Sequence, residues 1–340
     1  MKKFLVWLLM SILLLSACSS ENTTPNKPNN TTIDDQIVDS DSNSKNLSDL
    51  IEAFDRSATI QETILFDERQ IKISATNLSF SATDVNLAVT IQNNSAKKLN
   101  FSCGSASCDV NSINGIMAAD GFLSCEVQVG EKVDEIISFD IGELIANGFS
   151  NVANIEIGFW VSSDDYDNFY TGVLGVNTSA NDGFDYSKNT YQELTNSKEF
   201  GEIFDCNILY FSNDLLYEST DSTIRVLSVS IIENTNGDVQ ALFEIENNSD
   251  AKIQAWGKET HINGELIKSY SSWIESINAK RRLIASFPLS SYAEEYSGDI
   301  DVSVLKEFSF ILSSGENSNI ANDSGKITVT TDDLSIILIK

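Results

Sequence analysis

An internal repeat is the feature of this sequence that most constrains its fold. The stretch "VNLAVTIQNNSAKKLNF" (85–101) aligns without gaps with "VQALFEIENNSDAKIQA" (239–255). Each reads as an alternating strand, then Asn-Asn-Ser, then a Lys and a second strand. Because self-similarity at a fixed spacing marks a repeated structural unit, both stretches are predicted to adopt the same fold.

The similarity continues beyond the first aligned stretch at an offset near 150 residues. Ile113-Asn114-Gly115 matches Ile262-Asn263-Gly264, and Asn-Gly favours a tight hairpin turn. The first copy is longer around Cys103 to Cys108. Three later segments also match: 127–141 with 275–289 (Phe139 with Phe287), 155–163 with 306–314, and 173–179 with 326–332.

Both copies consist of short stretches that alternate with period two, such as Leu87-Val89-Ile91, separated by Asn, Gly and Ser turns. This pattern is typical of a β-sandwich. The pieces "IGELIANG" and "LSSYAEEY" occupy equivalent places and predict a short crossover helix in each copy. We therefore expect an all-β chain built from two copies of one module of about 120 residues.

The start of the chain has the form of a secretory signal. Lys2 and Lys3 precede an apolar stretch from Phe4 to Leu15, which is too short to cross a bilayer. The segment ends Leu-Ser-Ala-Cys, which resembles the lipobox of bacterial lipoproteins. That resemblance implies lipid attachment to Cys18, cleavage before it, and an anchor on the extracytoplasmic face of the cell membrane.

The repeated module resembles an uncharacterised family of immunoglobulin-like domains in surface and lipid-anchored proteins of clostridial-type bacteria. The segments that carry this resemblance are Ile91 to Ser95, Asn114-Gly115, Val127 with Gly130 and Lys132, Ile155 to Phe159, and Val173 to Thr178. The second copy keeps Asn263-Gly264 but has Asn278 in place of Gly130. The resemblance implies two tandem immunoglobulin-like β-sandwich domains after a disordered tether. It implies no activity, because the family has no established one.

These observations divide the chain into six predicted segments. They are a signal peptide (1–17), a disordered polar tether (18–45), a short helix or linker (46–60), a first module (61–180), a linker (181–206) and a second module (207–340). The names first module, linker and second module are kept below for the last three.

Four cysteines remain once Cys18 is set aside: Cys103, Cys108, Cys125 and Cys206. Two disulfides with three connectivities are allowed. A Cys103–Cys125 bridge is slightly favoured because the two lie on consecutive strand segments, with a Cys103–Cys108 loop and free buried thiols as alternatives. Trp273 takes the place of Cys125 in the second copy, so a bridge is no requirement of the fold.

Charge and motif content argue against most chemistries. With 22 basic and 50 acidic residues the net charge is −28, which opposes nucleic-acid binding. The acidic stretch "SSDDYDNF" (162–169) lacks the Gly and distal Glu of a calcium loop and is read as a turn. The sequence has no CxxC, no Gly-rich phosphate loop and a single histidine, His261. We expect no metal, no cofactor and no catalytic residues.

The aromatic residues of the second copy, Trp256, Tyr270, Trp273 and Tyr292, predict either core packing or a binding platform. The sequence therefore favours a lipid-anchored, non-catalytic binding, adhesion or envelope-accessory protein. Its expected partners are the membrane, through the lipid, and a surface protein or glycan. The alternative is a solute-binding lipoprotein of a transport system, although such proteins alternate strands with substantial helices.

Overall fold

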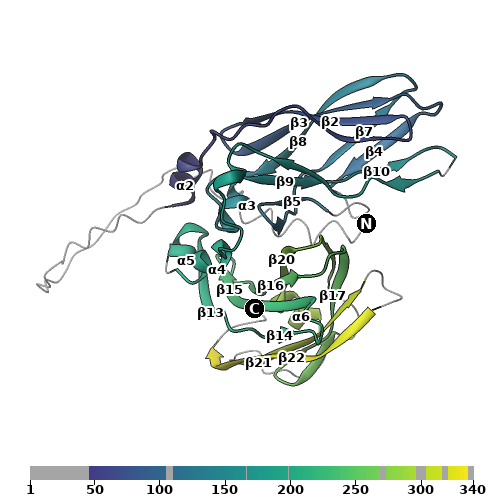
Figure 1. Ribbon diagram of the computed structural model, residues 1–340. Coiled ribbons are helices and arrows are strands. Elements are labelled where there is room, and N and C mark those ends of the chain that lie inside the picture. Colours follow the sequence, from purple (N-terminus) through teal and green to yellow (C-terminus); the bar gives the residue numbers. More distant parts are fainter. Residues whose placement is uncertain are drawn as a thin grey trace, which may run out of the picture.

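The computed structural model describes residues 46–104, 110–165, 167–197, 199–268, 273–295, 304–315 and 321–335. In this part of the chain the structure is mostly β, with several antiparallel sheets and a few short helices (Figure 1). The predicted signal peptide, Cys18 and the tether lie outside the described residues.

The first module contains two sheets that share one core. One has the order β1-β2-β3-β8 and another the order β11-β10-β4-β7. Buried side chains from both sheets, such as Val89 and Phe101, belong to the same cluster. The strands of the two sheets are β1 (Thr63–Glu68), β2 (Ile71–Phe80), β3 (Asp84–Asn93), β8 (Lys132–Asp140), β4 (Leu99–Cys103), β7 (Leu123–Val127), β10 (Trp160–Ser162) and β11 (Phe169–Tyr170).

Short helices accompany these sheets. Helix α2 (Leu47–Ala53) begins at a capping box, because Asn46 and Asp49 exchange side-chain-to-backbone hydrogen bonds. Helix α3 (Ile141–Ala146) follows β8 at the predicted crossover. The linker contains η1 (Asn181–Gly183), α4 (Thr190–Thr195) and α5 (Glu199–Ile203). It is packed rather than extended, since Tyr191, Phe200 and Ile203 are buried.

The second module repeats this plan with longer strands. A sheet with the order β18-β17-β21-β22, with β19 also on β17, shares a core with β13, β15, β16 and β20. The elements are β13 (Cys206–Ser212), β14 (Tyr217–Glu218), β15 (Ile224–Asn234), β16 (Val239–Asn247), β17 (Ile253–Ile262), β18 (Glu265–Lys268), β19 (Trp273–Ile277), β20 (Arg281–Phe287), α6 (Leu289–Glu295), β21 (Val304–Gly315) and β22 (Ala321–Ser335).

One sheet runs through both modules. Its order is β12-β9-β5-β6-β20-β16-β15-β13, with β14 on β15, and it also includes β5 (Ser112–Ile113), β6 (Ile116–Met117), β9 (Asn154–Ile157) and β12 (Leu174–Asn177). The β6–β20 pairing is parallel, whereas all other pairings among the described strands are antiparallel. The tandem arrangement expected from the sequence thus includes a direct strand pairing that the repeat did not predict.

The repeat is visible in individual hydrogen bonds. Asn93 is fully buried, and its side-chain amide donates to the carbonyls of Lys97 and Val127 while its oxygen accepts from Ser95. Asn247 is also fully buried and makes the same set of contacts with Ala251, Ile277 and Ser249. The Asn-Asn-Ser motif is therefore a structural element of each module.

The Asn-Gly hairpins also have the predicted geometry in both copies. Asn114 and Asn263 each have a φ of 50°, and the glycines after them have positive φ values as well. Positive φ at both central residues is what a tight hairpin turn of this type requires. These turns join β5 to β6 and β17 to β18.

Strand pairing corrects two parts of the sequence alignment by two residues. Lys132 pairs with Gln92, and Arg282 pairs with Glu246, which is the counterpart of Gln92. Arg282 is therefore the counterpart of Lys132. By this offset Phe287 corresponds to Ile137 rather than to Phe139. By the same offset Lys280 replaces Gly130, and both have positive φ. The segment 155–163 shifts similarly, because Ile155 corresponds to Phe308, whereas the alignment of 173–179 with 326–332 agrees with the strand pairing. A two-residue slip keeps every side chain on its predicted face, so the alternation could not reveal it.

The junction between the two modules as a candidate functional site

A buried carboxylate of the first module is bound by the second module. Arg281 on β20 donates from Nη2 to Glu156 Oε1 at 2.5 Å and from Nε to Oε2 at 3.0 Å. Ser112 Oγ and Asn278 Nδ2 donate to Oε2 at 2.6 and 3.1 Å. Asn278 also donates to the Val110 carbonyl at 2.7 Å, so two second-module residues bind the first module.

These contacts keep Glu156 ionised although it is only 9% exposed. Burial alone would raise the pKa of Glu156, but the hydrogen bonds from Arg281 and Ser112 and the arginine charge outweigh it and lower the pKa. A two-pronged arginine–carboxylate pair fixes orientation as well as distance. The pair therefore fixes the relative orientation of β9 and β20.

The next residue of β20 binds a second buried carboxylate. Arg282 Nη1 donates to Oε1 of Glu244, which is fully buried, at 2.8 Å. The linker contributes Asn189, whose side chain lies 2.9 and 3.0 Å from the two carboxylate oxygens, and Gln192 at 2.8 Å. Asn189 is also the N-cap of α4, so this helix is held on the second module by its first residues.

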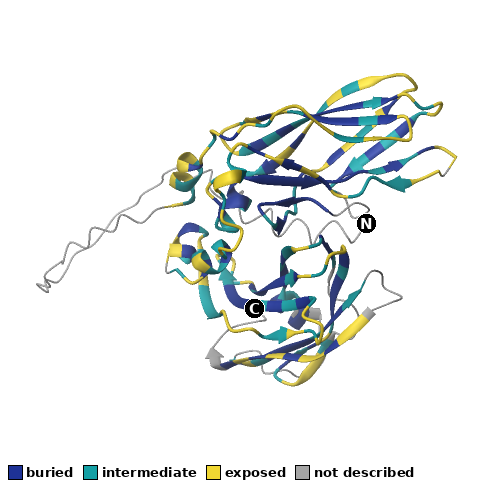
Figure 2. Cartoon of the chain, viewed as in Figure 1, coloured by how far each residue is buried: buried dark blue, intermediate teal, exposed yellow. Residues whose placement is uncertain are grey.

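Apolar contacts complete the junction. Met117 at the end of β6 is 7% exposed and belongs to the core cluster of the second module rather than of the first. The backbone N–H of Arg282 donates to the Gly115 carbonyl at 2.9 Å. Figure 2 shows mainly buried residues in the strands on both sides of this boundary. The two modules and the linker are thus joined by main-chain, ionic and hydrophobic contacts.

Sequence reasoning missed the residues of this junction. The one available signal was Arg281-Arg282, the chain's only adjacent arginines, in a sequence of net charge −28. Such a pair inside an alternating strand places one cation on each face. The partners Glu156 and Glu244 could not be found in this way, because acidic residues are abundant throughout the chain.

The structure places the two cysteines favoured for a disulfide on adjacent strands without joining them. Cys103 pairs with Leu123 and Cys125 with Phe101, so the two cysteines are diagonal neighbours. Both are free thiols. Residues at diagonal positions on paired strands are about 7–8 Å apart, whereas the Cβ atoms of a disulfide are about 4 Å apart. Cys108 lies outside the described residues, as does any bridge to it.

Other candidate groups have structural partners. In the acidic turn Lys97 binds Asp165 at 2.6 Å and Asp167 at 3.4 Å, and its hydrogen bond holds the pKa of Asp165 at about 2. The ring of His261 lies 2.6 Å from the Glu259 carbonyl. Trp256 and Tyr292 are buried, in agreement with core packing, while Tyr270 and the Trp273 side chain are not described.

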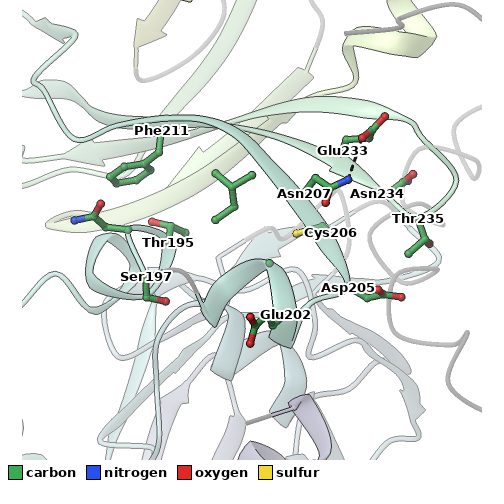
Figure 3. A pocket seen from close by; sticks show the side chains of 13 residues that line it. Thr195, Ser197, Glu202, Asp205, Cys206, Asn207, Phe211, Glu233, Asn234 and Thr235 are labelled. Carbon is green, nitrogen blue, oxygen red and sulfur yellow. Dashed lines mark hydrogen bonds between the residues drawn. The ribbon is translucent and has the colours of Figure 1, made fainter. Parts of the chain in front are cut away.

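The linker also borders an open cleft of about 600 Å³ (Figure 3). Its polar rim includes Glu202, Asp205 and Glu233, and Asn207 donates to Glu233 at 3.1 Å. Burial and, secondarily, the nearby Asp205 raise the pKa of the Cys206 thiol there to about 11. A thiol with such a pKa is protonated at neutral pH and is a poor nucleophile.

Within the described ranges there is no group of three or more His, Cys, Asp or Glu residues placed to hold a metal ion. No helix in those ranges is long and apolar enough to cross a membrane.

Comparisons with known proteins do not identify a family. No family model matches the sequence, and no curated protein matches it. Among solved structures, red sea bream transglutaminase matches at 8% identity and a TM-score of 0.19. The match covers 82% of this chain but 31% of the transglutaminase chain. This score supports no inference, so the function has to be inferred from the residues of this chain.

Proposed function

We propose that this protein is a lipid-anchored surface protein whose two immunoglobulin-like β-sandwich modules act together as a non-catalytic binding or adhesion unit. The location rests on the lipobox ending at Cys18, and the fold on the repeated module. The tether (18–45) separates the modules from the membrane.

The observation that carries the proposal is the junction itself. Glu156, Arg281 and Met117 join the modules through buried contacts, so the pair presents its outer loops at fixed positions. Fixed geometry lowers the entropic cost of contacting a partner at two places. The buried carboxylates Glu156 and Glu244 are bound by arginines, which suits a structural role better than proton transfer.

The transport alternative has less support from the fold. A solute-binding lipoprotein of the usual kind alternates strands with long helices around a parallel sheet. The described strands pair antiparallel apart from β6 with β20, and the described helices have at most seven residues. We therefore favour binding or adhesion over solute capture.

The anchor is tested by labelling cells with an alkyne fatty acid and comparing the wild type with Cys18→Ala. We expect label on the wild type only, and release or incomplete processing of the variant. Ser16→Ala is the control, because alanine keeps the small side chain of the lipobox. A Cys18→Ala variant that is still cleaved and anchored would contradict the lipid anchor.

The binding role is tested by mild crosslinking on intact cells followed by affinity purification. We expect a surface protein or glycan to be captured reproducibly with the wild type, and less of it with Arg281→Glu, which opens the junction. Turnover of a polysaccharide or peptide by the purified protein, lost on one Asp or Glu substitution, would show instead that the protein is an enzyme.

A further inference from the structure

The β5–β6 hairpin, through which the first module contacts the second, has an equivalent in the second module, the β17–β18 hairpin. In the first module Ile113 pairs with Ile116 and Ser112 with Met117. In the second, Ile262 pairs with Glu265 and His261 with Leu266.

The turn asparagines of the two hairpins also have the same partners. Asn114 accepts from the backbone of the strand beside it, at Ala153 and Asn154, and Asn263 does so at Lys306 and Glu307. The two hairpins are therefore equivalent in pairing and in turn geometry, and Leu266 is the counterpart of Met117.

The two hairpins differ in what covers them. In the first module Ile116 is 1% exposed and belongs to that module's own core, whereas Met117 is 7% exposed because it is inserted into the core of the second module. In the second module Glu265 is exposed and Leu266 is 45% exposed. A large apolar side chain thus lies in solvent at the position where its counterpart is inserted into a neighbouring core.

The surface that receives the hairpin also occurs twice. The first hairpin pairs with β20, where Arg282 lies opposite Ile116. The counterpart of β20 is β8, and the counterpart of Arg282 is Lys132, as the pairings with Glu246 and Gln92 show. Among the described strands, the outer edges of both β8 and β18 have no partner. The chain therefore contains both surfaces of a second contact of this kind, namely the β17–β18 hairpin and the outer edge of β8, and the described strands do not pair them within one molecule.

We propose that the β17–β18 hairpin of one molecule docks on β8 of the first module in a second copy of this chain, repeating the internal junction. In this arrangement Glu265 lies opposite Lys132, as Ile116 lies opposite Arg282. Both side chains are exposed and opposite in charge, which stabilises a cross-strand pair. Leu266 is placed beside the turn before β8, where Val129 is 57% exposed.

The contact is head-to-tail. Each molecule contributes its hairpin to one neighbour and its β8 edge to another, so repetition builds an open row of molecules rather than a closed dimer. The joint is weaker than the internal one, because Ser309 and Glu131 occupy the positions of Glu156 and Arg281. The net charge of −28 also repels copies, so the association strengthens with ionic strength.

Cysteine crosslinking in the membranes of cells that express the full chain tests this contact. Two differently tagged forms, Glu265→Cys and Lys132→Cys, are co-expressed and treated with a short bismaleimide crosslinker. We expect a mixed dimer that contains both tags. The matched control replaces Glu265→Cys with Leu215→Cys, at a side chain of the second module that is 47% exposed and lies outside the hairpin.

A second experiment tests whether this contact depends on Leu266. Leu266→Glu is expected to reduce the mixed crosslink about tenfold, because the variant loses the burial of the exposed part of the leucine and also places a carboxylate in the apolar contact beside Val129. Leu215→Glu is expected to leave it unchanged. A mixed dimer no more abundant than the Leu215→Cys control overturns the proposal. So does Glu265→Cys crosslinking to itself, which would indicate a symmetric hairpin-to-hairpin contact.

Discussion

Arg281 and Arg282 are neighbours on β20, yet they bind carboxylates in different parts of the molecule. Arg281 holds Glu156 of the first module, and Arg282 holds Glu244 beneath the linker. Because successive residues of a strand face opposite sides, one dipeptide connects three segments of the chain.

This arrangement predicts that removal of Glu156 destabilises the protein. Glu156→Ala leaves Arg281 and Asn278 without their acceptor, and we expect a loss of about 2 kcal/mol in the free energy of unfolding. Urea unfolding followed by fluorescence measures the loss. The control is Glu246→Ala, which breaks the more exposed Arg225–Glu246 pair and should cost less than about 1 kcal/mol. Equal losses in the two variants would contradict the role of the junction.

The two buried asparagines predict matched losses in the two modules. Asn93→Ala and Asn247→Ala each remove a side chain that satisfies several buried backbone groups, so each should cost about 2 kcal/mol. Asn94→Ala changes the exposed neighbour and should stay within about 0.5 kcal/mol of the wild type. Urea unfolding of all three variants tests this, and a loss at only one of the buried sites would argue against structural equivalence.

Much of the fold could be predicted from the sequence because the repeat and the alternation act locally. The strands, the short helices after β8 and β20, and the Asn-Gly turns follow from residue type and spacing over a few positions. The alignments of 127–141 and 155–163 slipped by two residues because alternation has a period of two and is insensitive to that shift. Only backbone pairing shows that Lys280, with its positive φ, corresponds to Gly130.

The junction could not be predicted in the same way, since it depends on contacts between residues far apart in the chain. Glu156 and Arg281 are 125 positions apart. Nothing in the alternating pattern of β9 marks Glu156 as buried. Met117 reads as an ordinary apolar residue of a hairpin, and its insertion into the other module's core is visible only in the folded chain.

The free thiols predict slow alkylation of the folded protein. Burial is the main cause that raises the pKa values of Cys103, Cys125 and Cys206 to about 11. At pH 8 only a small fraction is thiolate, the reactive form. Iodoacetamide should therefore label these residues slowly in the native state and quickly in urea without a reductant. Detection of a disulfide-linked Cys103–Cys125 peptide pair in a non-reduced digest would show instead that these two cysteines form a disulfide.

An acidic cluster in the first module predicts a stability that falls as pH rises. Burial, with the nearby Asp120 and Asp140, raises the pKa of Glu143 from 4.5 to about 8. The unfolded chain releases this proton near pH 4.5 and the folded chain near pH 8, so this contribution is lost between those values.

Glu143→Gln tests the effect, because the amide cannot ionise. Urea unfolding between pH 5 and pH 8 should show the wild type losing more stability with rising pH than the variant does. Comparison of the two slopes separates Glu143 from carboxylates of opposite behaviour, such as Glu156, whose pKa is lowered. Identical slopes would show that Glu143 is ionised in the folded protein.

The equivalent residues Met117 and Leu266 predict opposite outcomes for the same truncation. Met117→Ala removes a side chain that fills the core of the second module, so it should cost about 2–3 kcal/mol. Leu266→Ala shortens a side chain that is 45% exposed and should change the stability of the isolated molecule by less than about 0.5 kcal/mol. Dilute protein keeps molecules apart, so urea unfolding then reports the internal junction alone. Similar losses at both positions would mean that Met117 does not anchor one module in the other.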